Sequence, residues 1–332
     1  MKKRHFSMVD MAITRCCNMK CKFCTATKTH DFSKMMPFDE FKLYLNKIEM
    51  LINEKKIDMP SKYISYGNVG EPLMHPNFIE INEYAKGHGW KTGIYTNGVL
   101  LTEEKMRQIY SSGGIDTINI SITGIKTKIY KNFQGYGFVP EQQKRILKLV
   151  LNNIENAVKI REKQKKNTKI AVNYIITKKT FFHTVPYIRY MAKLGVDEIR
   201  FTPLIDRPRK LKKIKVKCDR LDQCLNIDEG GDISACNNDF LKKNVNGSIT
   251  TDYWIDSYQS LVCNMNSNNL TDLPAACQIC DRLNFSSFFD YMSMNFHGYL
   301  KIKNHKILWL ESLNEYLTTL KNKIIWYLTY KY

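Results

Sequence analysis

Three cysteines near the N-terminus have a spacing that predicts metal chemistry directly. Cys17, Cys21 and Cys24 stand at C-x3-C-x2-C spacing. Thiolates this close can hold one metal centre from a single loop, whereas the adjacent Cys16 points elsewhere. Three protein ligands on a four-iron cluster leave one iron open, and an open metal position marks a reacting site rather than a structural one.

Zinc is the alternative occupant of such a loop. Structural zinc is usually closed by four ligands, commonly arranged as two C-x2-C pairs. This loop offers a single C-x2-C pair and one further cysteine. The spacing therefore favours an iron–sulfur centre and leaves zinc as the competing interpretation.

Length and composition indicate a globular chain with a real core. The chain has 332 residues, which predicts about two domains. Its apolar content of 43% is ordinary, and no apolar run of 18 residues or more predicts a membrane span. The basic start, MKKRHFSMVDM, lacks the apolar stretch of a signal peptide. Ten cysteines without an export signal indicate metal ligands and thiols, so we expect a cytoplasmic, oxygen-sensitive protein.

The net charge of +19 fits several kinds of partner. Nucleic acid, an anionic lipid surface or a phosphorylated substrate would each suit it. However, no basic stripe interleaved with aromatic residues is present, and the densest basic run, 207–217, falls at an expected domain boundary. We therefore expect the charge to be spread over solvated faces and expect no nucleic-acid partner.

Hydrophobic periodicity predicts alternating strands and helices over the first 200 or so residues. Predicted strands cover 8–14, 63–66, 91–95, 117–122, 169–176 and 198–204, and predicted helices cover 37–55, 77–88, 102–112, 141–166 and 182–194. Such alternation predicts a parallel sheet with right-handed crossovers, an α/β barrel-like fold. Functional residues of that fold lie at the carboxyl ends of its strands.

Polar and glycine-containing segments follow several of these predicted strands. After the second strand, Gly70 permits a tight turn, Glu71 offers an acceptor for an ammonium group, and Pro72 stiffens the exit. An ordinary β-turn is the alternative interpretation. The segment 96–98 (Thr-Asn-Gly) follows the third strand, and Ser121 lies near the end of the fourth.

Together these features resemble the radical S-adenosylmethionine (SAM) family. The resemblance rests on the cysteine loop with an aromatic residue before its last cysteine, on Gly-Glu-Pro, and on Thr-Asn-Gly. In that family the open iron is chelated by the amino and carboxylate groups of SAM. An electron from the cluster then breaks a carbon–sulfur bond, which gives methionine and a 5′-deoxyadenosyl radical that removes hydrogen from substrate. The family fold is a partial (βα)6 TIM-like barrel.

The resemblance also implies the ligands of the two cofactors. Cys17, Cys21 and Cys24 would hold the [4Fe–4S] cluster. The residues implied to contact SAM are Phe23, Gly70, Glu71, Pro72, Thr96, Asn97 and Ser121. The chain departs from the family motifs at two positions. Val69 replaces the first glycine of the family's Gly-Gly-Glu-Pro motif, and Thr123 stands where the family more often has aspartate.

The pattern changes after residue 205 to short strands, turns and cysteines. A predicted hairpin around 228–231 is flanked by Cys218 and Cys236, and a later C-x2-C pair is formed by Cys277 and Cys280. This half resembles the small α+β twitch form of the SPASM domain, which holds an auxiliary [4Fe–4S] cluster. The resemblance implies these four cysteines as ligands, with Cys224 as a rival to Cys218.

A zinc knuckle of the same thiols is the alternative for this second set. No cysteine follows Cys280, so we expect one auxiliary cluster only. Cys16 and Cys263 are expected to be buried thiols rather than ligands.

Three segments are therefore expected. Residues 1–205 form the radical SAM core, 206–285 the auxiliary-cluster domain, and 286–332 a basic amphipathic tail. Apolar residues between 310 and 328 recur near helical spacing. This helix either docks on the barrel or makes peripheral contact with anionic lipid.

The resemblance implies an oxidoreductase in which the auxiliary cluster accepts an electron while a sugar- or cyclitol-type hydroxyl is oxidised. Arg200, on the sixth strand and facing the site, is hypothesised to anchor or deprotonate that hydroxyl, and a salt-bridged barrel arginine is the alternative. A peptide- or protein-modifying maturase is the second enzyme hypothesis, although no room for a leader-binding domain precedes residue 8. A non-catalytic zinc- or nucleic-acid-binding protein is the third. The enzyme would need a small-molecule or peptide substrate and an external one-electron donor such as flavodoxin or ferredoxin.

Overall fold

The computed structural model describes most of the first 203 residues and shorter parts of the remainder. The described ranges are 4–24, 34–67, 69–135, 137–177, 180–203, 224–234, 236, 245–258, 299–303 and 306–307. Of the cysteines discussed above, Cys218, Cys263, Cys277 and Cys280 lie outside them, as does the expected tail helix at 310–328.

Strands and helices alternate through the first 203 residues, as the periodicity predicts. The strands of this part are β1 (Arg4–His5), β2 (Met8–Met11), β3 (Ile57–Asp58), β4 (Tyr63–Tyr66), β5 (Lys91–Thr96), β6 (Thr117–Ser121), β7 (Lys169–Ile176) and β8 (Glu198–Pro203). The helices are α1 (Phe38–Asn53), α2 (Phe78–Gly87), α3 (Glu103–Ser111), α4 (Thr127–Tyr130), α5 (Pro140–Lys163) and α6 (Thr184–Leu194), with 3-10 turns at Pro72–Met74 and Phe181–His183. All six predicted strands and five predicted helices are confirmed; the short α4 was not predicted.

Local sequence signals explain where several helices begin and end. Thr102 caps α3 because its hydroxyl accepts a hydrogen bond from the backbone N–H of Lys105 at 3.2 Å. Pro140 opens α5, where its missing N–H costs nothing. Gly195 ends α6 with φ +83°, a left-handed conformation that glycine adopts without strain.

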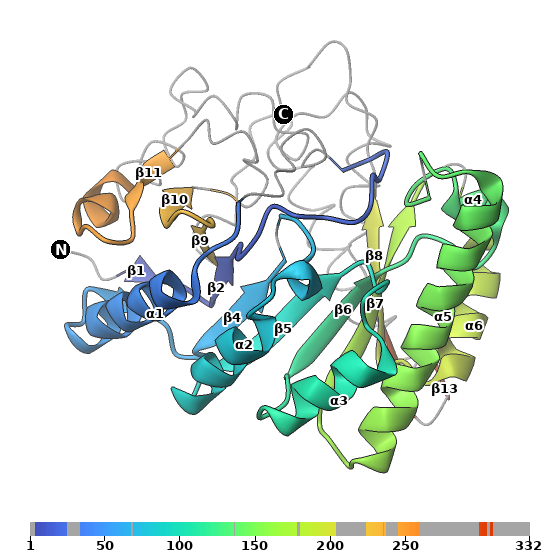
Figure 1. Cartoon of the computed structure of the whole chain (residues 1–332), viewed down its shortest axis with the longest axis horizontal. Helices are drawn as coiled ribbons and strands as arrows, with labels where there is room; N and C mark the ends of the chain where they lie inside the picture. The colour runs from blue at the N-terminus through green and yellow to red at the C-terminus, as the bar shows by residue number, and fades with distance from the viewer. Residues whose placement is uncertain are drawn as a thin grey trace, which may run out of the picture.

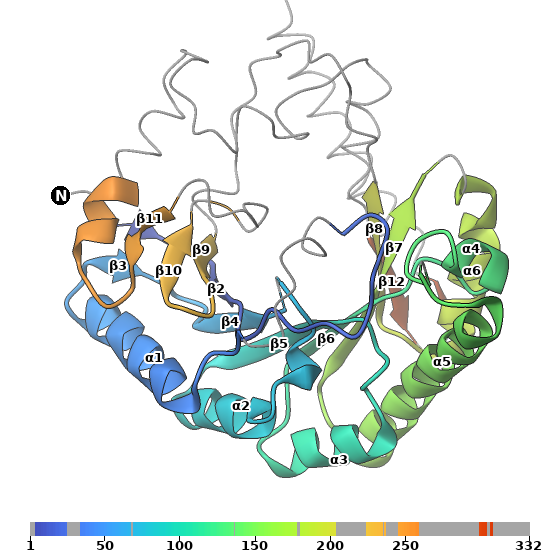
Figure 2. The same ribbon diagram turned by 45° about the horizontal axis from the view of Figure 1, so that its top comes forward.

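β1 and β3 pair with each other in a separate two-stranded sheet, and the other strands form one curved sheet with the helices outside it (Figures 1 and 2). Strands β2, β4, β5, β6, β7 and β8 pair in parallel in that order. Two further sets of strands extend the sheet among the described residues, to the order β11-β10-β9-β2-β4-β5-β6-β7-β8-β12-β13. The first set is β9 (Cys224–Ile227), β10 (Asp232–Ser234) and β11 (Val245–Ser248); the second is β12 (Tyr299–Lys303) and β13 (Lys306–Ile307).

The predicted hairpin is confirmed as β9–β10, but its position was not foreseen. β9 pairs in parallel with β2, with Met8 beside Cys224 and Met11 beside Ile227. The hairpin thus covers the edge that β2 would otherwise expose, so the core sheet continues into the segment assigned above to a separate domain.

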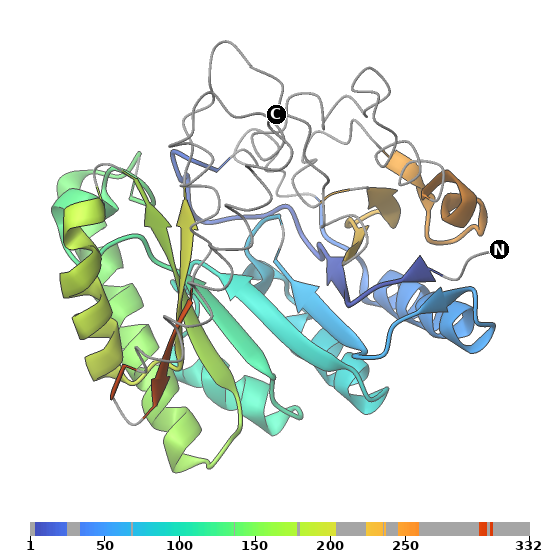
Figure 3. The same cartoon turned by 180° about the vertical axis from the view of Figure 1, so that it is seen from behind.

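The expected tail also contributes strands. β12 lies antiparallel to β8 at the other end of the sheet, which Figure 3 shows from behind. Antiparallel β12 satisfies backbone groups that β8 would leave open as an edge strand. No helix within the described ranges is both long and apolar enough to cross a membrane.

The two faces of the sheet have different environments. On the convex face, the ring of Tyr66 packs against Phe41 of α1 and Phe78 of α2, with centroids 6.2 and 5.9 Å apart. Tyr174 packs against Tyr187 of α6 at 4.2 Å. Because successive strand residues alternate between faces, the neighbours of these aromatic residues point to the concave face.

Candidate radical SAM site

Glu71 is the centre of a buried hydrogen-bond network at the carboxyl ends of β4 and β5. Its side chain is 1% exposed. One carboxylate oxygen accepts from the hydroxyl of Thr96 and the other from the backbone N–H of Asn97, each at 2.7 Å. The backbone N–H of Leu73 donates to the first oxygen at 3.3 Å. Burial raises the pKa of Glu71 to about 7, although the three donors act to lower it.

Gly70 brings this network against the start of the cysteine loop. A Cβ at Gly70 would lie 2.4 Å from the carbonyl oxygen of Thr14 and 2.7 Å from that of Cys16, and the residue has φ +76°. The backbone N–H of Glu71 donates to the same Cys16 oxygen at 2.6 Å. Glycine is therefore required here both by the close approach and by the backbone conformation.

Asn97 connects the network to the cysteine loop itself. Its side-chain N–H group donates to Asn18 Oδ1 at 2.7 Å and lies 3.9 Å from Cys17 Sγ. Its own Oδ1 accepts from the backbone N–H of Val99 at 3.0 Å, which fixes the orientation of the amide. Three strand ends therefore meet at one place: those of β2, β4 and β5.

The thiols of the cysteine loop are suited to bind a cationic centre. Burial raises the pKa of Cys17 to about 12, and the charges of Glu71 and Cys24 add to that increase. Burial also raises the pKa of Cys21 strongly, and Cys24 and Cys17 contribute. These groups lie close enough to repel one another as thiolates, so their anionic form needs a cation beside them, which iron would provide.

No three His, Cys, Asp or Glu side chains within the described ranges converge as the ligands of a single ion would. The cysteines of an iron–sulfur cluster each bind a different iron, so they do not have to converge on one point. The donor set present here, three thiols on one loop, fits such a cluster.

Comparison with known proteins agrees with this geometry. Residues 11–162 match the family description "Radical SAM superfamily". These residues form a radical SAM domain. The matched range starts at the end of β2, includes the cysteine loop, the Glu71 network and β6, and ends within α5.

Curated relatives share part of this chain. A tungsten-containing aldehyde ferredoxin oxidoreductase cofactor-modifying protein from Pyrococcus furiosus is 28% identical over 196 residues, which cover 59% of this chain and 51% of the relative. A probable GTP 3′,8-cyclase from Methanococcus maripaludis is 27% identical over 206 residues, 60% of this chain and 61% of the relative. The match thus spans between about half and three fifths of these relatives' own lengths.

Solved structures share the fold. Streptococcus suis SuiB bound to S-adenosylmethionine has a TM-score of 0.59 and 14% identity, and the match covers 83% of this chain and 71% of SuiB. Native anSMEcpe with bound AdoMet has a TM-score of 0.55 and 13% identity, and the match covers 96% of this chain and 98% of that one. The radical SAM α/β core is therefore shared with proteins whose structures contain the sulfonium cofactor.

Two other residues implied by the family occupy the same rim. Phe23 packs against Phe133, with ring centroids 6.4 Å apart, and the backbone N–H of Lys22 donates to the Phe133 carbonyl at 2.9 Å. The cysteine loop therefore extends across the strand ends to the turn after α4 (Figure 2). Ser121 ends β6, where its carbonyl accepts a hydrogen bond from the side chain of Gln134.

Arg200 is held in an ion pair. Its guanidinium pairs with the carboxylate of Glu198 and donates to the Tyr95 hydroxyl at 3.1 Å. Burial acts to lower the pKa of Arg200, but Tyr95 and Glu198 outweigh it and raise that pKa above its usual value. Arg200 therefore stays cationic in an ion pair, as in the salt-bridged alternative, and does not serve as the base that removes a proton.

Two cysteines of the second set lie within the described residues. Cys224 begins β9 on the same face as Asn226, and Cys236 follows the end of β10. Both lie at the open end of the hairpin, just beyond the last described pair, Asn226–Ser234. This end is level with the start of β2, about 10 Å along the strands from the rim that carries the cysteine loop.

Sequence reasoning missed three positioning residues. Asn18 was not considered, although it directly follows Cys17. Asn153 lies on the buried face of α5 and donates to the carbonyls of Gly98 and Val99 at 2.8 and 3.1 Å, so it fixes the turn after Asn97. An asparagine among the apolar residues Val150, Ile154 and Ala157 of the buried face was a usable signal.

The third missed residue is Arg15, which joins the cysteine loop to the hairpin. Its Nε lies 2.5 Å from Glu229 Oε1 and its terminal nitrogen 3.8 Å from Asp228 Oδ2. Both Arg15 and Glu229 are about 6% exposed. Nothing in the local sequence pairs these residues, because they are 214 positions apart.

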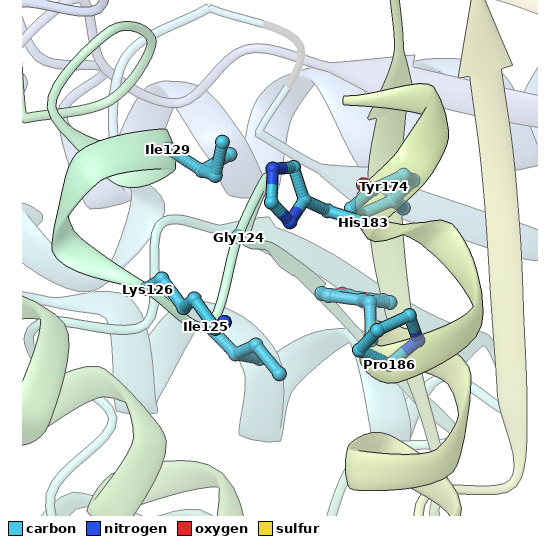
Figure 4. A pocket seen from close by; sticks show the side chains of 8 residues that line it. Gly124, Ile125, Lys126, Ile129, Tyr174, His183 and Pro186 are labelled. Atoms are coloured by element: carbon cyan, nitrogen blue, oxygen red, sulfur yellow. The ribbon is translucent and has the colours of Figure 1, made fainter. Parts of the chain in front are cut away.

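A small pocket lies between α6 and the segment before α4, away from the Glu71 network (Figure 4). Its lining includes Gly124, Lys126, Ile129, Tyr174, His183 and Tyr187. The hydroxyls of Tyr174 and Tyr187 donate to the carbonyls of Thr180 and Ile122 at 2.7 and 3.0 Å. Both tyrosine hydroxyls are thus committed to the backbone, and none of the residues that line the pocket belongs to the Glu71 network or the cysteine loop.

Proposed function

We propose that this chain is a radical SAM enzyme that reductively cleaves SAM and removes a hydrogen atom from its substrate. The observation that carries the proposal is the meeting of the cysteine loop, Glu71 and Asn97 at one rim of the sheet. When bound, the cluster and SAM supply the electron and the 5′-deoxyadenosyl radical that the family uses. The chain supplies the ligands and the shape of the site.

Each residue at the rim has a separate task in this proposal. Cys17, Cys21 and Cys24 hold three irons. Gly70 lets the backbone approach the loop, so an amino group bound at the open iron could donate hydrogen bonds to backbone carbonyls. Glu71 keeps Asn97 and the strand ends in register, because its two oxygens are already occupied by donors from β5.

We further propose that the second set of cysteines holds one auxiliary [4Fe–4S] cluster that would accept an electron from the substrate once a hydrogen atom has been removed from it. The position of Cys224 and Cys236 at one end of the hairpin supports them as two of its ligands. The concave face of β2 and β9 lies between that end and the cysteine loop, so a substrate held there would be reached from both sides. The remaining ligands would come from Cys218, Cys277 and Cys280.

The proposed reaction is the oxidation of a carbinol to a carbonyl. The hydrogen atom on carbon would go to the 5′-deoxyadenosyl radical, the hydroxyl proton to a base or to water, and the remaining electron to the auxiliary cluster. Arg200 would orient the oxygen of such a substrate, since its raised pKa keeps it cationic. An external one-electron donor of the flavodoxin or ferredoxin kind would reduce the first cluster.

Anaerobic purification followed by iron, sulfide and zinc analysis tests the proposal. About eight iron atoms per chain are expected for two clusters, falling to about four when Cys17, Cys21 and Cys24 are replaced by alanine. Dithionite and SAM should then yield 5′-deoxyadenosine with the native chain and none with the triple variant. The variant Cys16→Ala is the matched control, because Cys16 is a fully buried neighbour outside the ligand set and should leave both readouts unchanged. Zinc in place of iron, or SAM that stays intact with reductant, would overturn the proposal.

A further inference from the structure

We propose that the concave face of the sheet binds a small ligand rich in hydroxyl or ammonium donors, through an inward polar set of Asp10, Ser65, Asn119 and Asn226. This inference rests on the proposed function, since the ligand would be the substrate of that site. It adds the chemical class of the substrate and the residues that recognise it.

Strand alternation places the inward polar set on one face. Ser65 precedes Tyr66, whose ring faces α1 and α2, so Ser65 points to the concave side. Asp10 is the register partner of both Ser65 and Asn226, which puts three polar side chains in a row across β9, β2 and β4.

Asn119 of β6 joins the set two strands further along. Its neighbour Ile120 faces α5, because a Cβ at Gly98 would meet Ile120 at 2.9 Å and Val150 of α5 at 3.1 Å. Asn119 therefore points inward, beside its register partner Tyr95. Tyr63 lies on the same concave face, two residues before Ser65 on β4, and a Cβ at Gly93 would lie 1.9 Å from its hydroxyl oxygen.

Three buried oxygens of the set lie on the concave side as hydrogen-bond acceptors. Asn119 Nδ2 donates to the Ile94 carbonyl at 3.3 Å, and Asn226 Nδ2 donates to the Cys224 carbonyl at 3.2 Å, so both amide donors are committed to backbone. Asn119 Oδ1, Asn226 Oδ1 and Ser65 Oγ have no hydrogen-bond partner among the described residues. All three residues are at most 3% exposed.

Buried acceptors without partners are costly, and native proteins keep few of them. A ligand that donates several hydrogen bonds would satisfy these oxygens, and the Asp10 carboxylate, 6% exposed, adds negative charge that favours an ammonium donor. Loss of one such hydrogen bond in a buried site weakens binding by about tenfold.

The charges on this face do not suit a phosphorylated ligand. The inward cations Lys169 and Arg200 both pair with Glu198, within the part of the chain that the structure describes. Neither is left open for a bidentate phosphate contact. The described residues of this face therefore lack the open cationic side chains that binding a nucleoside triphosphate requires.

The test is equilibrium binding to the iron-loaded chain in the presence of SAM and without reductant. The probes are glucosamine, myo-inositol and GTP, with affinity measured by saturation-transfer NMR titration. We expect saturable binding of glucosamine and weaker binding of myo-inositol, because only the former carries an ammonium group for Asp10. GTP should not compete with either.

Variants then assign the site. Ser65→Ala and Asn119→Ala should each weaken glucosamine binding by about tenfold. The control Asn82→Ala removes another fully buried asparagine whose Oδ1 also lacks a described partner, but which lies on α2 and donates to the Gly114 carbonyl. It should leave binding unchanged. Ser65→Ala removes a single oxygen, so it keeps the test interpretable if Asn119→Ala misfolds.

Absence of saturable binding by both glucosamine and myo-inositol would overturn the inference, as would equal effects of the concave variants and Asn82→Ala. Competition by GTP would overturn it too. The proposed function fails separately, through the absence of 5′-deoxyadenosine formation in the same preparation once reductant is added.

Discussion

The ion pair between Arg15 and Glu229 gives the sharpest prediction about how the molecule holds its cysteine loop. Arg15 lies two residues before Cys17, and Glu229 lies at the turn of the β9–β10 hairpin. Both side chains are about 6% exposed. Removing one partner of such a buried pair costs about 3–5 kcal/mol, and the cost of removing Glu229 lies at the lower end because Arg15 keeps Asp228 at 3.8 Å.

The perturbations are Arg15→Met and Glu229→Met, alone and together. For a folded unit of 150–250 residues, that cost corresponds to a fall in Tm of about 6–20 °C in each single variant. The double variant should be less destabilised than the sum of the two, because no charge of the pair remains buried. Thermal unfolding followed by circular dichroism measures all four proteins, and iron retained per chain should fall in the single variants.

The matched control is the exposed pair Arg107–Glu103 on α3. Its nitrogen–oxygen distance is also 2.5 Å, but both side chains are 53% exposed. Breaking it should change stability by about 0.5 kcal/mol or less. Equal shifts of Tm for the two pairs, or strict additivity of the Arg15 and Glu229 variants, would refute the reasoning.

Three further predictions concern the rim. Because burial raises the pKa of Glu71 from 4.5 to about 7, the metal-free folded state keeps its proton longer than the unfolded chain. The free energy of unfolding of the metal-free protein should therefore fall by about 3 kcal/mol as pH rises from 4.5 to 7 and then level off. Urea titrations at several pH values measure this dependence, and Glu71→Gln should make the free energy of unfolding less dependent on pH over that range. Gly70→Ala should lower the free energy of unfolding by at least about 2 kcal/mol and reduce retained iron, since its Cβ would lie 2.4 Å from a backbone oxygen. The control is Gly89→Ala, because Gly89 also has a positive φ, +78°, but open space around it. This variant should lose less stability and retain full iron. Asn153→Ala should cost about 1–3 kcal/mol because the Gly98 carbonyl loses its shorter hydrogen bond, at 2.8 Å, and keeps only that from the Leu101 N–H at 3.4 Å among the described residues; unchanged thermal unfolding would contradict the role assigned to Asn153.

Local sequence was sufficient to predict the strands and helices of the core. Strand β4 and strand β7 have the predicted bounds because short apolar runs with β-branched and aromatic residues are flanked by turn residues on both sides. The cysteine spacing, Glu71 and Thr96–Asn97 were recognisable for a related reason. Each lies at the carboxyl end of a strand or in the segment that follows it, and parallel strands bring their carboxyl ends to one edge.

Contacts between distant segments were decided only by the tertiary structure. The pairing of β9 with β2, the ion pair of Arg15 with Glu229 and the inward polar set all join residues that no local period relates. β12 is a similar case, since it pairs with β8 from a segment expected to be a tail. Periodicity specifies which face of an element is buried, but the partner of that face depends on register and on which edges remain to be covered. The sequence by itself therefore determined the strands, the helices and the thiol loop, and the assembled sheet determined which charges and acceptors surround them.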